Sequence, residues 1–191
     1  MNTAEEQLQL IERMIKQSQQ KISDNGQFYL LWGWVALAAS LIHFSLLRFT
    51  DFSMPYLVWI ILMPLAGIVS SIMGRRQSKQ AERTLYSDKV MPYLWAGCTI
   101  SMLILIVLGY KITWNIVYPL LLIIWAIGLF SSGALIRFKP LLYAAALNWI
   151  LAIFAFFVAF DIQLLLIACS MLFSYLVPGY MLQAQARRDA A

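Results

Sequence analysis

The sequence predicts an all-α fold of the polytopic membrane class, with six transmembrane helices arranged as three hairpins behind an amphipathic helix. Three observations predict it: the composition, six long apolar runs, and one charged island between the second and third runs. The chain is 62% hydrophobic and 12% charged, whereas soluble domains carry about 25% charged residues. A chain of 191 residues leaves much of its surface exposed, and these polar residues are too few to cover it. We therefore expect lipid to cover that surface.

Six apolar runs, each of 19 to 23 residues, contain no Asp, Glu, Lys or Arg. Each is long enough to cross a hydrocarbon core of ~30 Å as a helix, and lipid forces helices because it offers the backbone no hydrogen-bond partners. We expect a transmembrane domain over 28–182 and a cytoplasmic tail over 183–191. The predicted spans are 28–47, 55–73, 91–109, 114–136, 140–160 and 162–182.

The charged island 74–89 carries five cations and two carboxylates. With six spans it shares one side of the membrane with both termini and the loop at 137–139. That side holds twelve of the fourteen Lys and Arg residues, and the other holds only Arg48 and Lys111. Short cytoplasmic loops are rich in Lys and Arg. The pattern predicts a bacterial inner-membrane protein with both termini cytoplasmic, and the lipid bilayer rather than nucleic acid as the partner of its net positive charge.

The first 27 residues form a polar segment that we expect to be a cytoplasmic amphipathic helix. Residues 3–6 match a capping box, and Asn25-Gly26 is typical of a helix end. Between them, apolar residues recur at helical spacing: Leu8, Ile11, Ile15 and Ile22. Such a helix could lie on the bilayer, pack under the bundle, or dock a partner or a second copy. The sequence leaves these alternatives open.

Small residues four apart predict close helix packing in lipid, at Ala36-xxx-Ser40, Gly67-xxx-Ser71 and Gly128-xxx-Ser132. Each of the three hairpins also ends in a basic cluster, as true repeats would. Any hairpin under the positive-inside rule would look the same, so repetition stays an open hypothesis.

Polar residues inside the runs are the candidates for chemistry. Asn148 is mid-depth in the fifth run, where its amide could bond across helices or line a cavity. A ligand pocket around it would include Trp125, Trp149, Thr99, Ser101 and Ser174. His43, the only histidine, is expected to hydrogen-bond a neighbouring helix or interfacial water rather than to titrate in a mechanism.

Catalytic motifs do not match this chain. Rhomboid intramembrane proteases also have six spans, but Phe130-Ser131-Ser132-Gly133 lacks the glycine that must precede their serine. The sequence has no HExxH, GxGD, P-loop or paired carboxylate. Cys98 and Cys169 both lie in apolar runs, without metal-ligand spacing. We expect neither an enzyme nor a cofactor or metal site.

In length and span number the chain resembles the substrate-binding S-components of vitamin uptake transporters. Those proteins dock a partner through small residues four apart on the first span, where this chain has Ala36-xxx-Ser40 instead of an alanine pair. Their pattern has no long N-terminal amphipathic helix. The chain also resembles small bacterial six-span inner-membrane proteins in which such a helix runs directly into the first span.

The leading expectation is a non-enzymatic regulatory or scaffold module that engages a cytoplasmic protein or a second copy. The alternative is a small-molecule transport component with a pocket near Asn148. The residues expected to contact a partner are the helix stripe and the basic loop: Leu8, Ile11, Ile15, Ile22, Arg75, Arg76, Lys79 and Arg83.

Overall fold

The computed structural model describes the backbone of residues 4–80 and 86–189, and the side chains of 26–76 and 89–188. All the secondary structure in these ranges is helical, so the predicted all-α class is confirmed. The elements are α1 (Ala4–Phe49), α2 (Leu57–Gln80), α3 (Tyr86–Ile112), α4 (Trp114–Leu135), α5 (Lys139–Ala155), α6 (Phe160–Ser170), the π-helical turn η1 (Met171–Leu176) and α7 (Val177–Asp189).

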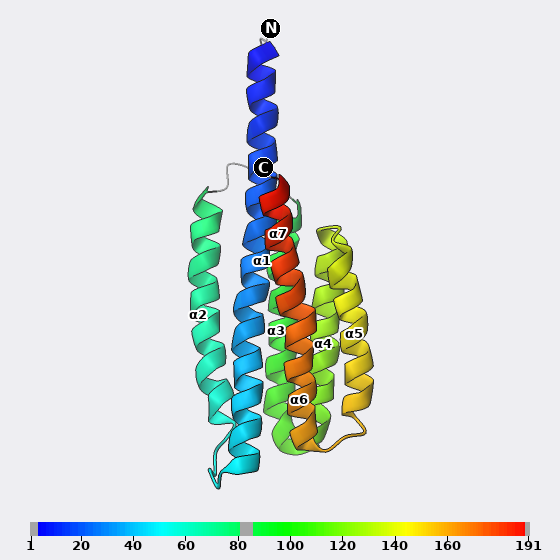
Figure 1. The fold of residues 1–191 in the computed structure, drawn as a ribbon. Coiled ribbons are helices and arrows are strands. Elements are labelled where there is room, and N and C mark those ends of the chain that lie inside the picture. The colour runs from blue at the N-terminus through cyan, green and yellow to red at the C-terminus, as the bar shows by residue number, and fades with distance from the viewer. Residues whose placement is uncertain (1–3, 81–85, 190–191) are drawn as a thin grey trace.

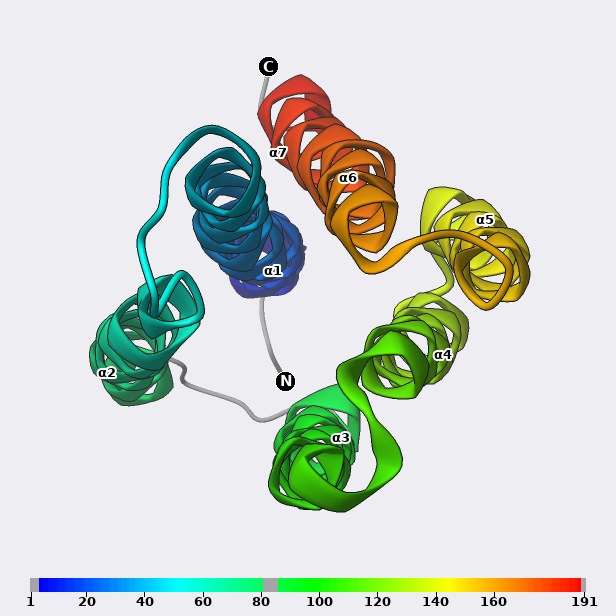
Figure 2. The ribbon, with the colours of Figure 1, turned by 90° about the horizontal axis from the view of Figure 1, so that it is seen from below.

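The helices stand side by side and alternate in direction (Figure 1). Both ends of the chain lie at the same end of the bundle. The elements α6, η1 and α7 follow one another as a single rod that packs against α1. Viewed along the axis in Figure 2, the helices follow one another around an open ring in the order α2, α1, α6 with α7, α5, α4 and α3.

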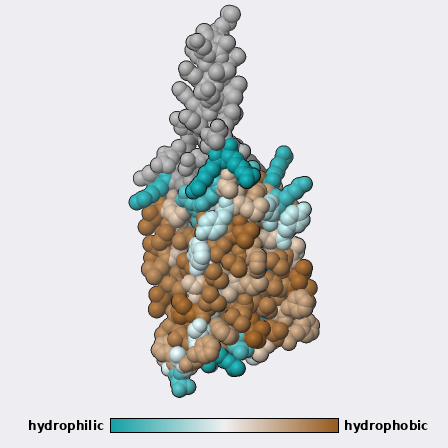
Figure 3. All heavy atoms as spheres, in the orientation of Figure 1, coloured by the Kyte–Doolittle hydropathy of each residue, from teal (hydrophilic) through white to brown (hydrophobic). Residues whose placement is uncertain are grey.

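Five helical segments are long and apolar enough to cross a membrane: Gly26–Phe49, Leu57–Arg76, Lys89–Ile112, Trp114–Leu135 and Phe160–Arg188. The apolar helix α5 is shorter, with 17 residues. Figure 3 shows a broad hydrophobic band around the bundle with hydrophilic residues above and below it. Exposed apolar side chains on this scale are stable only in contact with lipid or protein. The fold is that of a multi-pass membrane protein.

The helix end expected at Asn25-Gly26 is wrong, and with it the separate helix over 1–27. The helix α1 runs through both residues without a break and contains 46 residues. Its N-terminal part extends well past the other helices in Figure 1. An internal glycine costs a helix only ~1 kcal/mol relative to alanine. At Gly26 the absence of a side chain allows a close contact with another helix, and α1 continues through this residue.

That contact is the crossing of α1 and α7. A Cβ added to Gly26 would lie 2.9 Å from the carbonyl oxygen of Gly179, and one added to Gly179 would lie 2.9 Å from Cδ2 of Leu30. One heptad further on, a Cβ on Gly33 would meet Tyr175 and Leu176 at under 3.0 Å. Two glycines on α1 and one on α7 therefore let the backbones approach closely, which is how helices associate in lipid.

The buried face of α1 continues this pattern towards the opposite end of the bundle. The buried residues recur three and four apart: Gly26, Tyr29, Gly33, Ala36, Ala39, Ser40 and His43. This spacing is that of a coiled-coil seam. The Ala36 and Ser40 of the predicted packing motif lie within this seam, and Ser40 donates a hydrogen bond to the carbonyl of Ala36 at 2.7 Å.

The helices α2 and α3 are attached at the edges. Among the described helices, α2 has close backbone neighbours only in α1, and α3 only in α4. In the apolar stretch of 18 residues that makes each of these helices a candidate span, only 6% of the residues of α2 and of α3 are buried inside the bundle. The corresponding fraction is 56% in α4 and 50% in the rod formed by α6, η1 and α7. The core therefore lies between α1, α4, α5 and this rod.

Candidate functional site

Among the residues whose side chains are described, seven polar ones are buried inside this apolar bundle. They are Ser40, His43, Ser132, Asn148, Gln163, Ser170 and Ser174. In lipid, a polar group without a partner costs several kcal/mol, so the bonds of these residues show which helices are held together.

Asn148 of α5 is fully buried and faces the rod of α6 and η1. Its Oδ1 accepts hydrogen bonds from Ser170 Oγ at 2.5 Å and from Ser174 Oγ at 3.2 Å. Ser174 Oγ also lies 3.2 Å from the carbonyl oxygen of Ala144, so its single proton serves two acceptors. Asn148 Nδ2 is buried without a protein partner. The amide thus links α5 to the rod, which is the cross-helix arrangement that its depth suggested.

The structure brings Asn148 and Ser174 together but places the other predicted pocket residues elsewhere. Trp149 is 37% exposed and its ring lies 5.6 Å from that of Phe130. Trp125 is partly buried and packs against the core. Thr99 and Ser101 are exposed on α3, where Ser101 donates to the carbonyl of Gly97 at 2.9 Å. The network includes Ser170 instead, which faces Asn148 from one turn before Ser174.

The turn η1 explains how Ser174 and Tyr175 reach different neighbours. Pro178, fully buried just beyond it, has no N–H for the carbonyl of Ser174, and its ring would crowd that carbonyl in a regular α-helix. The backbone widens instead, and Val177 N–H bonds the carbonyl of Leu172, five residues back. Such π-turns are often found at functional sites.

A second buried cluster joins four elements near the Gly33 crossing. Tyr175 of η1 has ring centroids at 5.9 Å from Tyr29 of α1 and at 6.5 Å from Trp95 of α3. The Tyr29 hydroxyl faces Ser132 of α4, and Ser132 Oγ lies 3.3 Å from the sulfur of Met91. The Tyr175 hydroxyl is buried without a protein partner. The sequence analysis did not single out this cluster, because its residues come from four separate elements that no local spacing connects.

Near the other end of the bundle, His43 is 3% exposed and belongs to a cluster of aromatic rings. Its Nδ1 accepts a hydrogen bond of 2.9 Å from the indole of Trp59 on α2. The neutral ring must therefore carry its proton on Nε2. Phe160 packs edge-on against both His43 and Tyr118. The structure thus gives His43 the bond to a neighbouring helix that the sequence led us to expect.

Gln163 ties three helix ends together and was not singled out from the sequence. Its Nε2 donates to the carbonyl of Asn115 at the start of α4, at 2.9 Å, and to the carbonyl of Ala155, the last residue of α5, at 2.8 Å. Carbonyls at a helix end lack partners within the helix. Gln163 supplies one at Ala155, where α5 ends five residues before the predicted 160.

Of the predicted partner contacts, only two have described side chains, and these lie at the end of the bundle that holds both chain termini. Arg75 and Arg76 are exposed near the end of α2. Lys79 belongs to the same helix, outside the residues whose side chains are described, and Arg83 lies outside the described residues. The stripe Leu8, Ile11, Ile15 and Ile22 falls within α1, in the part for which only the backbone is described.

Comparison with known proteins identifies no relative, because no family model, curated protein or solved structure matches the chain. Within the described residues, no group of three His, Cys, Asp or Glu side chains is placed to hold a metal ion.

Proposed function

We propose that this protein crosses the bacterial inner membrane six times, with both termini cytoplasmic, and acts as a non-enzymatic regulatory or scaffold module. Its working surface is the projecting part of α1, residues 4–25, together with the basic end of α2, which carries Arg75 and Arg76, and the segment that follows it. The proposed partner is a cytoplasmic protein or a second copy of the chain.

The observation that carries this proposal is the continuity of α1. The projecting part and the intramembrane part are one helix of 46 residues. The intramembrane part is fixed at the Gly26–Gly179 crossing, so the projecting part is held at a defined angle to the bundle. A helix anchored in this way can present a surface to a partner at a lower entropic cost than a flexible tail can.

The sequence of the projecting part supports a docking role. Leu8, Ile15 and Ile22 precede the buried Tyr29 by whole heptads, so the apolar stripe continues the direction of the buried seam with a drift of only ~20° per heptad. Acidic residues also outnumber basic ones in residues 4–25. That balance opposes adsorption of this segment to anionic lipid and favours a protein partner.

The test replaces two residues of the stripe in the full-length protein, as Ile11→Asp with Ile15→Asp. The matched control is Gln17→Asp with Gln20→Asp, which adds the same charge on the opposite face of the helix. Both proteins are expected to insert and to remain monodisperse. In-cell crosslinking from residues 4–25, and native mass measurement of the purified protein, are expected to lose a partner or an oligomer only for the stripe variant. Equal crosslinking patterns for the two variants would refute the proposal.

A further inference from the structure

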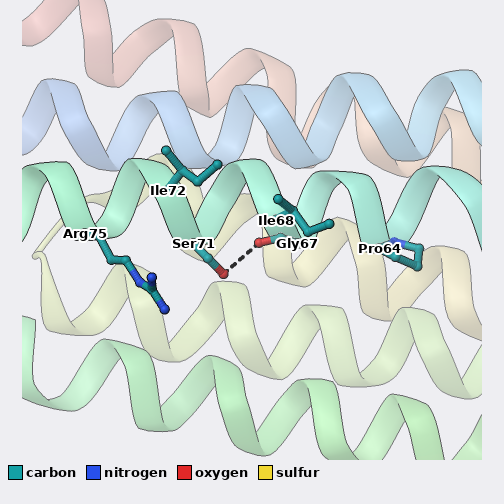
Figure 4. A pocket seen from close by; sticks show the side chains of 6 residues that line it. All are labelled: Pro64, Gly67, Ile68, Ser71, Ile72 and Arg75. Carbon is teal, nitrogen blue, oxygen red and sulfur yellow. Dashed lines mark hydrogen bonds between the residues drawn. The ribbon is translucent and has the colours of Figure 1, made fainter.

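One face of α2 is hollowed into a groove. It is lined by Pro64, Gly67, Ile68, Ser71, Ile72 and Arg75, and its volume is about 440 Å³ (Figure 4). All six residues come from one helix, at spacings that place them on one face. Five of the six residues are exposed, whereas Ala66 is buried and Ser70 bonds Trp32 of α1. The groove is therefore on another face than the one that contacts α1, the only close backbone neighbour of α2 among the described helices.

Local chemistry explains the hollow. A Cβ added to Gly67 would meet nothing within 4 Å, so this part of the helix surface is bare backbone. Ser71 donates its hydroxyl proton back to the carbonyl of Gly67 at 2.8 Å, which satisfies the hydroxyl within the helix. The groove ends at Pro64, and beyond it the helix carries the branched side chains of Ile60 and Ile61, which are 59% and 57% exposed.

The groove has the dimensions of one lipid leaflet. From Pro64 to Arg75 the helix rises about 16 Å, at 1.5 Å per residue. Half of a hydrocarbon core of ~30 Å is about 15 Å. The groove thus reaches from the polar end of α2, at Arg75, to a point near the middle of the bilayer. An extended acyl chain lying along α2 matches both its length and its mainly apolar lining.

The positive charge of Arg75, at the polar end of the groove, favours a lipid with an anionic headgroup. Arg75 lines the groove where it leaves the apolar band. A guanidinium forms paired, charge-assisted hydrogen bonds with phosphate oxygens. The adjacent Arg76 is also exposed but does not line the groove. We propose that this groove is a binding site for an anionic phospholipid, with one acyl chain along Gly67 and Ser71 and the phosphate on Arg75.

A transmembrane helix from a second copy fits the same face less well. A helix would need contact along the whole span, whereas the prominent Ile60 and Ile61 limit the hollow to half of α2. Two copies related by an axis along the membrane normal would pair their α2 helices in parallel and bring the two Arg75 side chains to the same level. The like charges would repel each other in the thin polar layer. The assignment of the lipid to the inner leaflet rests on the proposed orientation of the protein. The groove and its basic end are independent of that orientation.

The test uses the full-length protein purified in detergent and supplied with equal amounts of phosphatidylglycerol and phosphatidylcholine with the same acyl chains. Native mass spectrometry measures the ratio of the two lipids retained. We expect Arg75→Gln to lower the preference for phosphatidylglycerol about fivefold, as follows from ~1 kcal/mol per cation near anionic lipid. Arg76→Gln is the matched control and should change the ratio less than twofold. Excess inorganic phosphate should not displace the bound lipid, because the acyl chain contributes to binding.

A second pair of variants tests the groove itself. Gly67→Leu fills it and should reduce retention of both lipids, whereas Gly97→Leu, at an equally open glycine on α3, should not. Equal effects of the two arginine variants, or undiminished lipid retention in Gly67→Leu, would overturn the proposal. A change of oligomeric state in Gly67→Leu would assign the groove to a second copy instead. None of these substitutions lies in residues 4–25, so this outcome is independent of the docking test.

Discussion

The α1–α7 crossing makes a sharp prediction for Gly26. In Gly26→Ala the new Cβ would lie 2.9 Å from the carbonyl oxygen of Gly179, and the next nearest atoms, from Gln183 and Leu182, are at 3.1 and 3.3 Å. The closest neighbour is backbone and cannot rotate away. To reach an ordinary contact distance the helices must separate by about 0.5 Å.

The energy of this change is the difference between two terms. Overpacking of a tight contact costs typically ~1–3 kcal/mol, and alanine improves the helix by up to ~1 kcal/mol over glycine. We therefore expect Gly26→Ala to lose about 1–2 kcal/mol of stability. The control is Gly97→Ala, where a Cβ meets nothing within 4 Å, and which should be neutral or slightly stabilising.

The measurement is the free energy of unfolding of the two variants and the parent protein, by steric trapping or denaturant titration in the same detergent. A Gly26→Ala protein as stable as Gly97→Ala would refute the close crossing. It would also remove the structural reason why the helix continues through residues 25 and 26.

Two further predictions concern orientation and the buried amide. In a background without the native cysteines, single cysteines at Ser78 and Gln185 should react with an impermeant maleimide only after the cells are opened, whereas one at Ser53 should react in intact spheroplasts; the reverse pattern would contradict the proposed orientation. Asn148→Leu should lose at most ~1–2 kcal/mol of unfolding free energy, because intramembrane hydrogen bonds are modest and Nδ2 already lacks a protein partner; a loss above ~3 kcal/mol would show that the amide carries more of the packing than its contacts suggest.

The apolar helices could be predicted from the sequence because a helix that crosses lipid needs a long, uninterrupted run of apolar residues, and such runs can be seen directly in the sequence. Trp114, where a helix was expected to begin, is also the first residue of α4. The end of α5 was missed because Gln163, eight residues beyond Ala155, caps that carbonyl from another helix. Likewise, the pair Asn25-Gly26 indicates the end of a helix unless one knows that Gly179 of α7 packs against Gly26. A local signal cannot report a tertiary contact.

For the polar residues too, the local sequence predicted the need for a bond but not the partner that makes it. The depth of Asn148 indicated a bond across helices, because a mid-membrane amide must find a partner. Which partners it finds depends on how α5 faces the rod, so Ser170 could not be separated from other serines by spacing alone. Tyr175 was hidden for a similar reason, since its direction depends on the widened turn before Pro178.

The central position of α1 links these features. Two indole N–H groups connect α2 to α1, from Trp59 to His43 at 2.9 Å and from Trp32 to Ser70 at 3.4 Å. The helix α1 also holds α7, through the glycine crossing. A displacement of α1 along its axis would therefore disturb both the attachment of α2 and the packing of the rod. The same helix extends into the projecting part, so a partner bound there would act on the element that joins α2, at one edge of the bundle, to the core.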